Sequence, residues 1–598
     1  MSTPVVGTAP LGHAPLAPSP AGWSWALLAV VAPTLIAAHD PPSVTFYNQA
    51  LAVLGWGVWL AWMGQAGGGL DREVAPRAQA GRWALTGVLV VLMAAALGSV
   101  WFGTLPGGLG LMGSGLSAAA LLTFHSGWRQ GRAPTRDGVA ELFFGALAVA
   151  GAVGLLLAGV QVFVPGWADG TWIAAPNMVG RAVGNLRQPN HFSTLLVFAA
   201  ASMAWLGARR RLSAGVAALG VAACIGGIVL TASRTGMVAM VFLSAWGVLD
   251  RRLPRTLRVA LVAAPLLYGA WWGGMWLLSQ TDQAVAFAAE TRLHDGSDIS
   301  SSRFKIWANV LGLIQQHPWW GVGYGEFNLA WTLTPFPNRP VAFFDHTHNV
   351  VLQWAVELGL PAATVLSLLA LWGWWALVRP GSSTERKSGE PATVGAAAVI
   401  VTTAGLHSLL EYPLWYSYFL LPTAFAWGLG LAAREGAART TDTGRPRWGF
   451  AGGVILALMA VWCALDYQAA ANIYAPRPGA STLERRIAFG QQMPWWGYQA
   501  DYAHVTTRDP DEPSRPPQAF ARTLHNLLDA RLMMAYARSL AEHGEVDKAR
   551  FVVARLKEFR NGSAKAFFAA CKVPQPSQEM PFQCTPPQRH YHWRELLP

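Results

Sequence analysis

Five short polar motifs interrupt a chain that is otherwise strongly apolar. They bring together amides, guanidinium groups, imidazoles and a phenol. They lie at residues 184–191 (GNLRQPNH), 233–236 (SRTG), 303 (R), 345–349 (DHTHN) and 407–415 (HSLLEYPLW). Such groups are costly at membrane depth unless they face a polar cavity. Each motif therefore has a binding or catalytic interpretation and a structural one.

The first two motifs supply groups that suit an anionic ligand. Arg187, Gln188 and Asn190 lie where a loop meets an apolar run, and capping of the next helix by Asn190 is the structural alternative. Arg234 lies inside a hydrophobic stretch, whereas most other arginines lie in loops. Because a guanidinium can bind phosphate through two parallel hydrogen bonds, Arg234 predicts a phosphate site. An arginine that snorkels to the lipid interface is the alternative.

The histidine motif predicts a general base. His346 and His348 could bind a metal, but metal sites usually have a third or fourth ligand and carboxylates are sparse here, so we predict none. His348 directly precedes a predicted helix at residues 349–358, and a helix N-terminus disfavours an imidazolium. A neutral His348 near pH 7 has the form that a base requires. His346 or Asp345 could orient it.

The remaining motifs add an ion pair and a hydrogen-bond donor. Arg303 lies on a predicted amphipathic helix, where a surface ion pair is the alternative to ligand binding. Glu411 could pair with an arginine, and Tyr412 could donate to a leaving-group oxygen or a sugar. An interfacial aromatic belt is the alternative for Tyr412 and Trp415. Together these groups fit an anionic lipid-linked donor, such as a pyrophosphate, and a hydroxyl acceptor that must be deprotonated. ATP is not implied, because the sequence has no Walker-type loop.

Composition places these motifs in a membrane protein. Of 598 residues, 53% are hydrophobic and 13% are charged, about half the charged share of a soluble domain. A helix needs roughly 20 residues to span a bilayer. The first apolar run, residues 23–38, is expected to be a retained helix and not a signal peptide. Apolar runs are centred near Leu28, Trp56, Val90, Leu116, Val149, Val197, Ala222, Val241, Ala263, Leu368, Val399, Phe425 and Leu458.

The distribution of basic residues predicts the orientation of these runs. Basic clusters occur in six loops, at residues 72–82, 129–136, 209–211, 251–258, 379–387 and 434–447. All six fall on one side if the N-terminus is cytoplasmic, as the positive-inside rule requires. This explains the net charge of +12 without nucleic acid. The same threading puts the five polar motifs on the outer side.

The predicted fold is an all-α polytopic membrane protein of about 13 transmembrane helices, with a periplasmic loop domain and a C-terminal periplasmic helical domain. The segments are residues 1–22 (cytoplasmic), 23–279 (helices 1–9), 280–348 (large outer loop), 349–466 (a short helix and helices 10–13) and 467–598 (outer tail).

Local patterns predict helices in the two outer segments. Residues 302–316 repeat Phe304, Trp307, Val310, Leu311 and Ile314 at helical spacing. The short helix at 349–358 should break at Gly359 and Pro361. Residues 527–560 of the tail should form a helical hairpin that turns at Gly544, packed through residues 533, 537, 540, 549 and 553.

The tail also holds a candidate disulfide. Cys571 and Cys584 are separated by a short polar loop. A disulfide between them is expected if the tail lies outside the cytoplasm. Two free thiols are the alternative.

These motifs resemble the O-antigen ligase and polymerase superfamily, and within it the PglL-type protein O-oligosaccharyltransferases. The resemblance covers most of the chain. Its most specific parts are residues 185–191, 233–236, 303–327 with HPWWGVGYG at 317–325, 346–349, and EYPL at 411–414. The EYPL motif and the long polar tail favour the protein-glycosylating branch. The N-linked enzymes differ, because their Trp-Trp-Asp signature is here Trp-Trp-Gly at residues 319–321 and 495–497.

The resemblance implies an inner-membrane enzyme with a periplasmic active site. Such enzymes move an oligosaccharide en bloc, with inversion and without a metal or other cofactor. The donor is undecaprenyl pyrophosphate, and the acceptor is a Ser or Thr hydroxyl of a pilin or another periplasmic protein. His348 matches the essential histidine, Arg234 and Arg303 match the pyrophosphate-binding arginines, and Gln188 and Tyr412 match further important positions. Arg187 is grouped with the pyrophosphate site, and Asn190, His346, Asn349 and Glu411 with its support.

Three alternatives stay open at this point. An O-antigen ligase would keep the chemistry and use lipid A–core as acceptor, and a polysaccharide polymerase would use a second lipid-linked glycan. A transporter would line its pathway with polar residues at the midplane. Transporters more often show internal repeats and broken helices in matching positions, and this sequence shows no such symmetry.

Overall fold

The structure is a computed structural model. It describes residues 18–65, 69–70, 76–133, 135–281, 286–294, 299–337, 339–379, 391–434, 440–441, 447–507, 512–572 and 580–598. In these residues the fold is almost entirely helical, as predicted, and its strands are one antiparallel pair, β1 (Gly69–Leu70) and β2 (Thr440–Thr441). The basic residues Arg72, Arg386, Lys387, Arg439 and Arg445 lie outside the described part.

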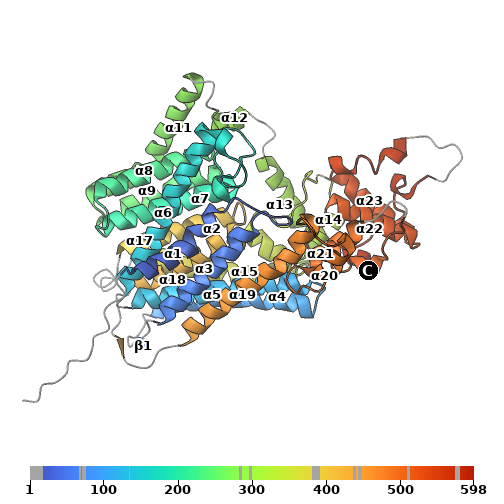
Figure 1. Ribbon diagram of the computed structural model, residues 1–598, viewed down its shortest axis with the longest axis horizontal. Coiled ribbons are helices and arrows are strands. Elements are labelled where there is room, and N and C mark those ends of the chain that lie inside the picture. The colour runs from blue at the N-terminus through green and yellow to red at the C-terminus, as the bar shows by residue number, and fades with distance from the viewer. Residues whose placement is uncertain are drawn as a thin grey trace, which may run out of the picture.

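A bundle of apolar helices forms the larger part of the molecule (Figure 1). Its members are α1 (Pro20–Val30), α2 (Ala32–Leu35), α3 (Phe46–Gln65), α4 (Pro76–Trp101), α5 (Gly107–Arg132), α6 (Arg136–Phe163), α7 (Pro189–Ala208), α8 (Ala214–Leu230), α9 (Arg234–Leu249), α10 (Arg255–Val262), α11 (Ala264–Thr281), α15 (Val350–Val378), α17 (Pro391–Ser408), α18 (Ser417–Ala433) and α19 (Arg447–Tyr474).

Most of the predicted apolar runs correspond to one helix each, with two exceptions. The first run, expected as one helix over residues 23–38, is divided into α1 and α2 and its helical part ends at Leu35. The second exception is the ninth run. Its centre, Ala263, lies at a break where α10 and α11 bend by 62°. Pro265 explains the bend, because a proline cannot donate to the carbonyl four residues earlier and its ring crowds the preceding turn. Hydropathy alone predicted one straight span here.

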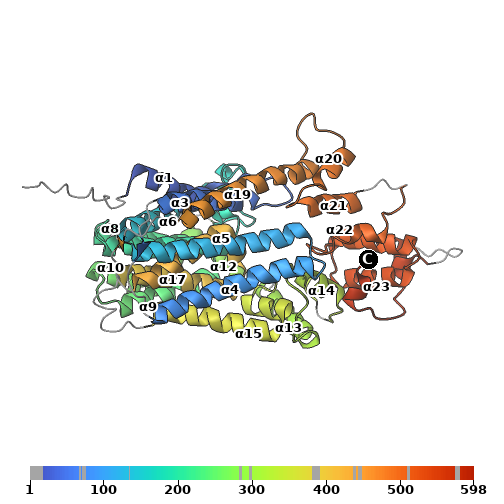
Figure 2. The same cartoon turned by 90° about the horizontal axis from the view of Figure 1, so that it is seen from below.

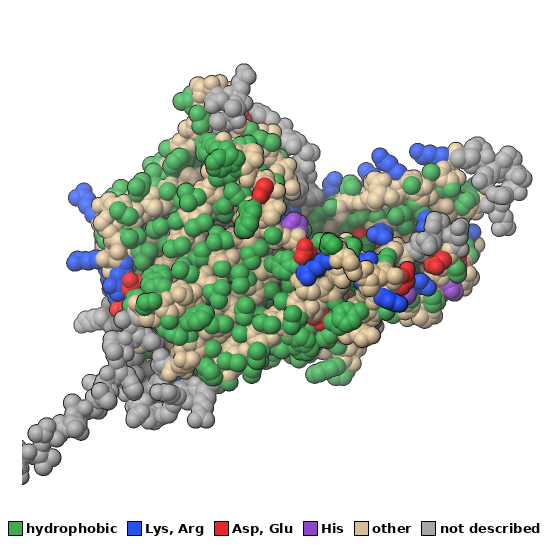
Figure 3. Space-filling model, viewed as in Figure 1, with side chains coloured by type: hydrophobic (Ala, Val, Ile, Leu, Met, Phe, Trp, Pro, Cys, Tyr) green, Lys and Arg blue, Asp and Glu red, His purple; other side chains and the backbone are tan. Residues whose placement is uncertain are grey.

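The chain is a multi-pass membrane protein by the length and composition of its helices. Among the described residues, α4, α5, α6, α7, α15 and α19 are long and apolar enough to cross a bilayer, and the bent pair α10–α11 is a seventh candidate. The helices α8, α9 and α18 are apolar but shorter. The face in Figure 3 is broadly hydrophobic over the bundle, with basic side chains toward its ends. The expected number of 13 spans stays a prediction.

Glycines bring helices of the bundle into close contact. A Cβ on Gly57 of α3 would lie 2.6 Å from the backbone nitrogen of Ala457 in α19. A Cβ on Gly428 of α18 would overlap the carbonyl of Phe124 in α5. Small residues allow such packing between helices that share a lipid environment. The second contact fixes α18 against α5, and both of these helices line the cavity described below.

The basic connections gather at one end of the bundle. Arg209, after α7, pairs with Asp137 at the start of α6 at 2.6 Å. Arg434, after α18, donates to the carbonyls of Leu377 (2.7 Å) and Arg379 (2.8 Å) at the end of α15. The starts of α7, α9, α15 and α18 therefore lie at the opposite end. We call these the basic end and the outer end.

The outer loop and the tail contribute further helices. The loop holds α12 (Ala288–His294), α13 (Ile299–Gln316) and α14 (Phe327–Leu333), and the tail holds α20 (Leu483–Gly490), α21 (Gly497–Thr506), α22 (Ala530–Glu542) and α23 (Val546–Glu558). The helices of the tail lie with α13 and α14 at the outer end (Figure 2). The 3₁₀ turns are η1 (Pro165–Trp167), η2 (Gly184–Leu186), η3 (Pro413–Trp415), η4 (Pro517–Phe520), η5 (Gly562–Ala564), η6 (Ala569–Lys572), η7 (Phe582–Cys584) and η8 (Trp593–Leu596).

The loop and the tail, which the sequence suggested as separate domains, share one hydrophobic core. Val310 of α13, Trp331 of α14, Val356 of α15 and Met533 of α22 all belong to one buried cluster. Burial of such side chains contributes about 1.5–3 kcal/mol each. The predicted hairpin is confirmed as α22 and α23, with Gly544 at a φ of 88° in the turn.

A buried ion pair fastens the tail to the loop. The guanidinium of Arg339 donates to Glu558 at 3.0 Å and to the carbonyl of Trp331 at 2.7 Å. It also lies over the ring of Phe559, 4.6 Å from the centroid. The charge is therefore paired and its donors are used, as burial of an arginine requires.

The buried face of helix α13 differs from the apolar stripe that the sequence predicted. Its buried face is formed by Ile306, Val310, Leu313 and Ile314, whereas Phe304 and Leu311 are 70% and 50% exposed. Phe304 and Leu311 are seven residues apart and share one side of the helix. The helix packs on α15 with the other side, which leaves Arg303 beside the bundle.

Candidate functional site

Glu411 is the centre of a polar cluster at the outer end. Its carboxylate forms an ion pair with Arg303 of α13 and accepts from Asn190 (3.1 Å) and Gln188 (3.4 Å) at the start of α7. The Arg303 side chain is 19% exposed and that of Glu411 is 9% exposed. The predicted pairing of Glu411 with an arginine is confirmed, and the pair is largely buried where a surface pair was the alternative.

Ser233 extends this cluster to Arg234. The Ser233 hydroxyl donates to the side-chain oxygen of Asn190 at 2.7 Å and accepts from the backbone N–H of Gly236 at 3.1 Å, so Ser233 caps α9. Arg234 is the first residue of α9, and its side chain is exposed. A helix N-terminus favours anions. The exposed guanidinium at that position adds its own positive charge to the attraction that the helix N-terminus has for a phosphate.

The second cluster is a stack of rings around His348. The His348 ring lies 4.5 Å from that of His346, 5.3 Å from Phe344 and 5.5 Å from Tyr412, between centroids. His348 is 8% exposed, and its Nδ1 is buried with no hydrogen-bond partner among the described residues. Its φ of 58° is the left-handed conformation, which costs a non-glycine residue free energy and persists only where the surrounding contacts hold it.

Burial and nearby positive charge keep His348 neutral. Burial is the main cause that lowers its pKa to about 3, and His346 and Arg303 add to the effect. The neutral imidazole can accept a proton, as the base assignment requires. Tyr412 has a pKa raised far above its ordinary value, first by burial and then by Tyr416 and Asp345. Its hydroxyl therefore stays a donor throughout the physiological range.

The loop that carries His348 is held at Thr347 through both its backbone N–H and its carbonyl. The Thr347 N–H donates to Gln353 at 2.8 Å, and the Thr347 carbonyl accepts from the Trp307 indole at 3.0 Å. Asn349 caps α15 through Val351 and Leu352, and its amide donates to the Leu409 carbonyl at 3.1 Å. Gln353 was not predicted as a site residue. The sequence indicated Gln353 only through its polarity, because it stands inside an apolar run.

His346 and Asp345 form the far side of this loop. The Asp345 carboxylate pairs with the His346 imidazole. Desolvation by the surrounding protein opposes ionisation of Asp345, whose side chain is nevertheless 64% exposed. The pairing with His346 outweighs this effect and lowers the pKa of Asp345 to about 2. His346 also lies against Tyr412, with ring centroids 3.2 Å apart. These contacts fix His346 beside both His348 and Tyr412.

The Gly-rich motif at residues 317–325 supports the first turns of α15. The helix breaks at Gly359, which has a φ of 83°, as predicted. The N–H groups of Val322 and Gly323 donate to the carbonyls of Val356 (2.8 Å) and Glu357 (3.0 Å) there. The loop thus satisfies carbonyls that the break would leave unpaired. The segment of α15 behind His348 is held in place by this motif.

Arg187 is not brought into either cluster. Its guanidinium donates to the carbonyls of Ala37 and Val44, the latter at 2.6 Å, and to Asn48 at 3.4 Å. These contacts fasten the loop between α2 and α3. Capping of α7, which the sequence suggested for Asn190, is performed by Gln188, whose side chain accepts from His191 N at 2.6 Å.

An apolar cavity of about 490 Å³ opens beside the ring stack. Side chains of α4, α5, α15 and α18 form its walls. The residues at its outer mouth include Tyr324, Asp345, Trp415 and His525. Its size and apolar walls are those of a ligand site. His525 of the tail pairs with Glu326 at 2.7 Å, so both outer segments contribute to the mouth.

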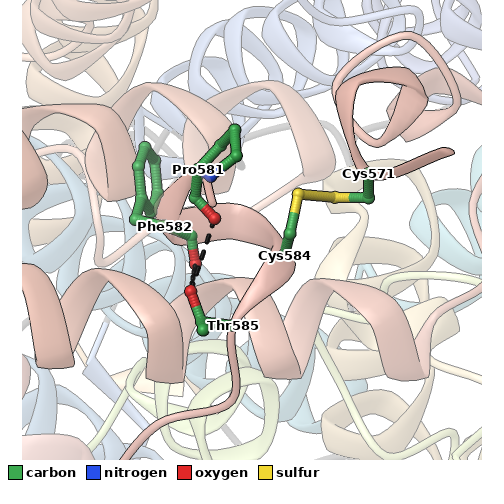
Figure 4. The surroundings of a disulfide bond; sticks show 5 residues. All are labelled: Cys571, Pro581, Phe582, Cys584 and Thr585. Atoms are coloured by element: carbon green, nitrogen blue, oxygen red, sulfur yellow. Dashed lines mark hydrogen bonds between the residues drawn. A yellow bond between two sulfur atoms is a disulfide. The ribbon is translucent and has the colours of Figure 1, made fainter. Parts of the chain in front are cut away.

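Two further expectations concern metal and sulfur. Within the described ranges no group of three or more His, Cys, Asp or Glu is placed to hold a metal ion. Cys571 and Cys584 form a disulfide with Cα atoms 5.3 Å apart (Figure 4). It closes the end of the tail beside α23 and lies apart from both clusters.

Three family models match successive parts of the chain. Residues 182–206 match the protein glycosylation ligase family, residues 219–367 match the O-antigen ligase family, and residues 395–570 match the C-terminal part of the virulence factor membrane-bound polymerases. The first two regions contain Gln188, Arg234, Arg303 and His348, and the third contains Glu411. The resemblance inferred from the motifs is confirmed.

Two curated proteins of Acinetobacter baylyi are similar to the chain. One is the general O-oligosaccharyltransferase, 29% identical over 263 residues, which are 42% of this chain and 43% of that protein. The other is the ComP-specific O-oligosaccharyltransferase, 27% identical over 260 residues, or 42% and 44%. The match therefore spans less than half the length of each relative.

Proposed function

We propose that this protein is a protein O-oligosaccharyltransferase of the bacterial inner membrane, with its active site at the periplasmic outer end. The observation that carries the proposal is the meeting of Arg303, His348 and the neighbours Glu411 and Tyr412, from three distant segments, beside an apolar cavity. The similarity to two O-oligosaccharyltransferases supports it. The donor is an oligosaccharide on undecaprenyl pyrophosphate, and the acceptor is a Ser or Thr of a periplasmic protein such as a pilin.

The cavity suits the lipid part of this donor. Its walls are apolar and run along α4 and α5 toward the middle of the bundle, while its mouth carries Asp345 and Trp415. The polyprenyl chain lies in the cavity, and the pyrophosphate lies at the mouth between Arg303 and Arg234. The N-terminus of α9 adds to the attraction for this anion.

The transfer is a single displacement with inversion. The acceptor hydroxyl attacks the anomeric carbon, its proton moves to His348, and the bond from that carbon to the pyrophosphate oxygen breaks. Charge that develops on the leaving pyrophosphate is stabilised by Arg303 and Arg234 in a site of low polarity. Tyr412 donates to the leaving group or the sugar. These arginines take the electrostatic role of a metal, so chelators should leave transfer unchanged.

Reconstitution in a host without its own ligase tests the proposal. The protein is expressed with a lipid-linked glycan and a candidate pilin, and glycan is measured on protein and on lipid A–core. Glycan on the pilin is expected. Glycan on lipid A–core alone would show an O-antigen ligase, the alternative that the match of residues 219–367 favours, and longer lipid-linked glycan would show a polymerase.

Two variants link the outcome to the site. His348→Ala should abolish transfer at an unchanged membrane level, and retained transfer removes His348 as the base. Arg234→Lys keeps the charge but loses the two-pronged geometry. Full activity of Arg234→Lys would argue against bidentate binding of the pyrophosphate.

A further inference from the structure

A second cavity lies at the basic end, far from the site described above. It measures about 580 Å³ and is bounded by the ends of α9 and α15 and the first half of α17. Its inner walls are apolar, with Phe242, Leu377 and Val399 among them. Its rim carries four arginines and one carboxylate, namely Arg251, Arg252, Arg379, Arg434 and Asp250.

Hydrogen bonds hold several residues of the rim in place. Asp250 accepts from the Trp246 indole at 3.4 Å and from the Arg252 N–H at 3.1 Å, which fixes the turn after α9. Arg434 is 6% exposed and donates to carbonyls at the end of α15, so its charge is held at the rim. Arg251 and Arg252, in the turn after α9, are exposed to solvent, whereas Arg379 and Arg434 come from the ends of α15 and α18. An anion at the rim would meet positive charge from two sides.

The depth of the cavity matches one leaflet of a bilayer. Its lining on α17 extends from Pro391 to Thr402, which is roughly 16 Å at 1.5 Å per residue. The hydrocarbon core of a bilayer is about 30 Å thick, so one leaflet is about half of that. Acyl chains that enter at the arginine rim would fill the cavity to the midplane.

We propose that this cavity binds a phospholipid with an anionic headgroup from the leaflet at the basic end. The phosphate lies at the arginine rim, in a headgroup without an ammonium group to offset its charge, and an acyl chain lies along α17. Basic pockets between transmembrane helices on the cytoplasmic side are known to select such lipids. The proposal does not depend on the transferase activity, because none of its residues belongs to the outer-end clusters.

Binding of phosphatidylglycerol to the purified full-length protein tests the proposal. Native mass spectrometry compares phosphatidylglycerol with phosphatidylethanolamine of the same acyl chains, and inorganic phosphate is added as a competitor. The wild type should prefer phosphatidylglycerol by about tenfold or more. In R251Q/R252Q, where both residues are exposed, the affinity should fall roughly 25-fold, since each arginine near an anionic headgroup contributes about fivefold.

Two further variants complete the test. R77Q/R255Q removes two exposed arginines from the same end outside the cavity, and it should change binding by less than about twofold if the rim is the cause. Ala398→Phe keeps every charge and fills the cavity, so it should lower binding of phosphatidylglycerol. Equal loss in the control, equal binding of both lipids, displacement by millimolar phosphate, or no retained lipid would each overturn the proposal.

Discussion

The ion pair between Arg303 and Glu411 gives a quantitative prediction for Glu411→Gln. The variant keeps one side-chain oxygen for the amide of Asn190 and removes the charge that holds Arg303. The other oxygen, which accepts from Gln188 at 3.4 Å, becomes an NH2 group, so this long hydrogen bond is lost as well. A hydrogen bond to a charged partner is worth about 1.5–3 kcal/mol. If this energy positions Arg303 against charge that develops on the pyrophosphate, kcat and kcat/KM should fall together by about 10- to 100-fold.

A double-mutant cycle separates positioning from a general loss of structure. Arg303→Gln alone should cost about 100- to 1,000-fold in transfer, the range for loss of one oxyanion donor. If Glu411 acts through Arg303, then adding Glu411→Gln to Arg303→Gln should cost only a fewfold more. The assay is transfer of glycan from purified lipid-linked donor to the acceptor protein, followed by gel shift.

A second ion pair provides the matched control. Arg211 and Glu141 are 2.8 Å apart at the basic end, with side chains 47% and 18% exposed. Glu141→Gln should change transfer by less than about twofold, because its partner Arg211 is 47% exposed and such a pair contributes little, and because the pair lies at the end opposite the site. The reasoning is refuted if Glu411→Gln is fully active, or if it costs the same factor with and without Arg303.

Three further predictions concern pH, the α2–α3 loop and the tail. With a His348 pKa lowered to about 3, protonation removes the base only in acid, so transfer should stay level from pH 8 to about pH 5; a fall centred near 6.5, the ordinary histidine value, would contradict this. Arg187→Gln should lower the free energy of unfolding by about 2–3 kcal/mol, because contacts with carbonyls are lost. This should appear as a lower Tm in detergent, while the transfer rate per folded molecule is unchanged. A loss of rate without a change in Tm would place Arg187 in the site. Cys571→Ser opens a loop of 13 residues and should destabilise the tail by about 3 kcal/mol, measured as faster proteolysis of the tail; unchanged proteolysis would contradict it.

The sequence predicted features that depend on neighbouring residues. The hairpin of α22 and α23 follows from apolar spacing such as Met533, Ala537 and Leu540, all buried. Asn349 and Gly359 mark the start of α15 and its break, because capping and a positive φ are local requirements. The motif residues at the starts of α7, α9 and α15 meet at one end because helices alternate in direction.

Local sequence patterns could not predict the features that depend on contacts between distant residues. Arg339 and Glu558 are more than 200 residues apart, and nothing local indicates that the loop and tail share a core. Arg187 was grouped with the pyrophosphate site because its type suits phosphate, but only the fold shows the carbonyls of residues 37–44 around it. The bend at Ala263 is different, because the local residue Pro265 explains it and a hydropathy average does not take the missing N–H of a proline into account.

The core that joins the outer loop to the tail limits how specificity can be engineered. Val310 lies two helical turns after Arg303 on α13. It packs in the same cluster as Met533 and Leu556 of the hairpin. A chimera that exchanges the tail alone would set foreign side chains against α13 and shift the helix that carries Arg303. Residues 299–349 and 483–598 should therefore be exchanged as one unit when acceptor preference is moved between related enzymes.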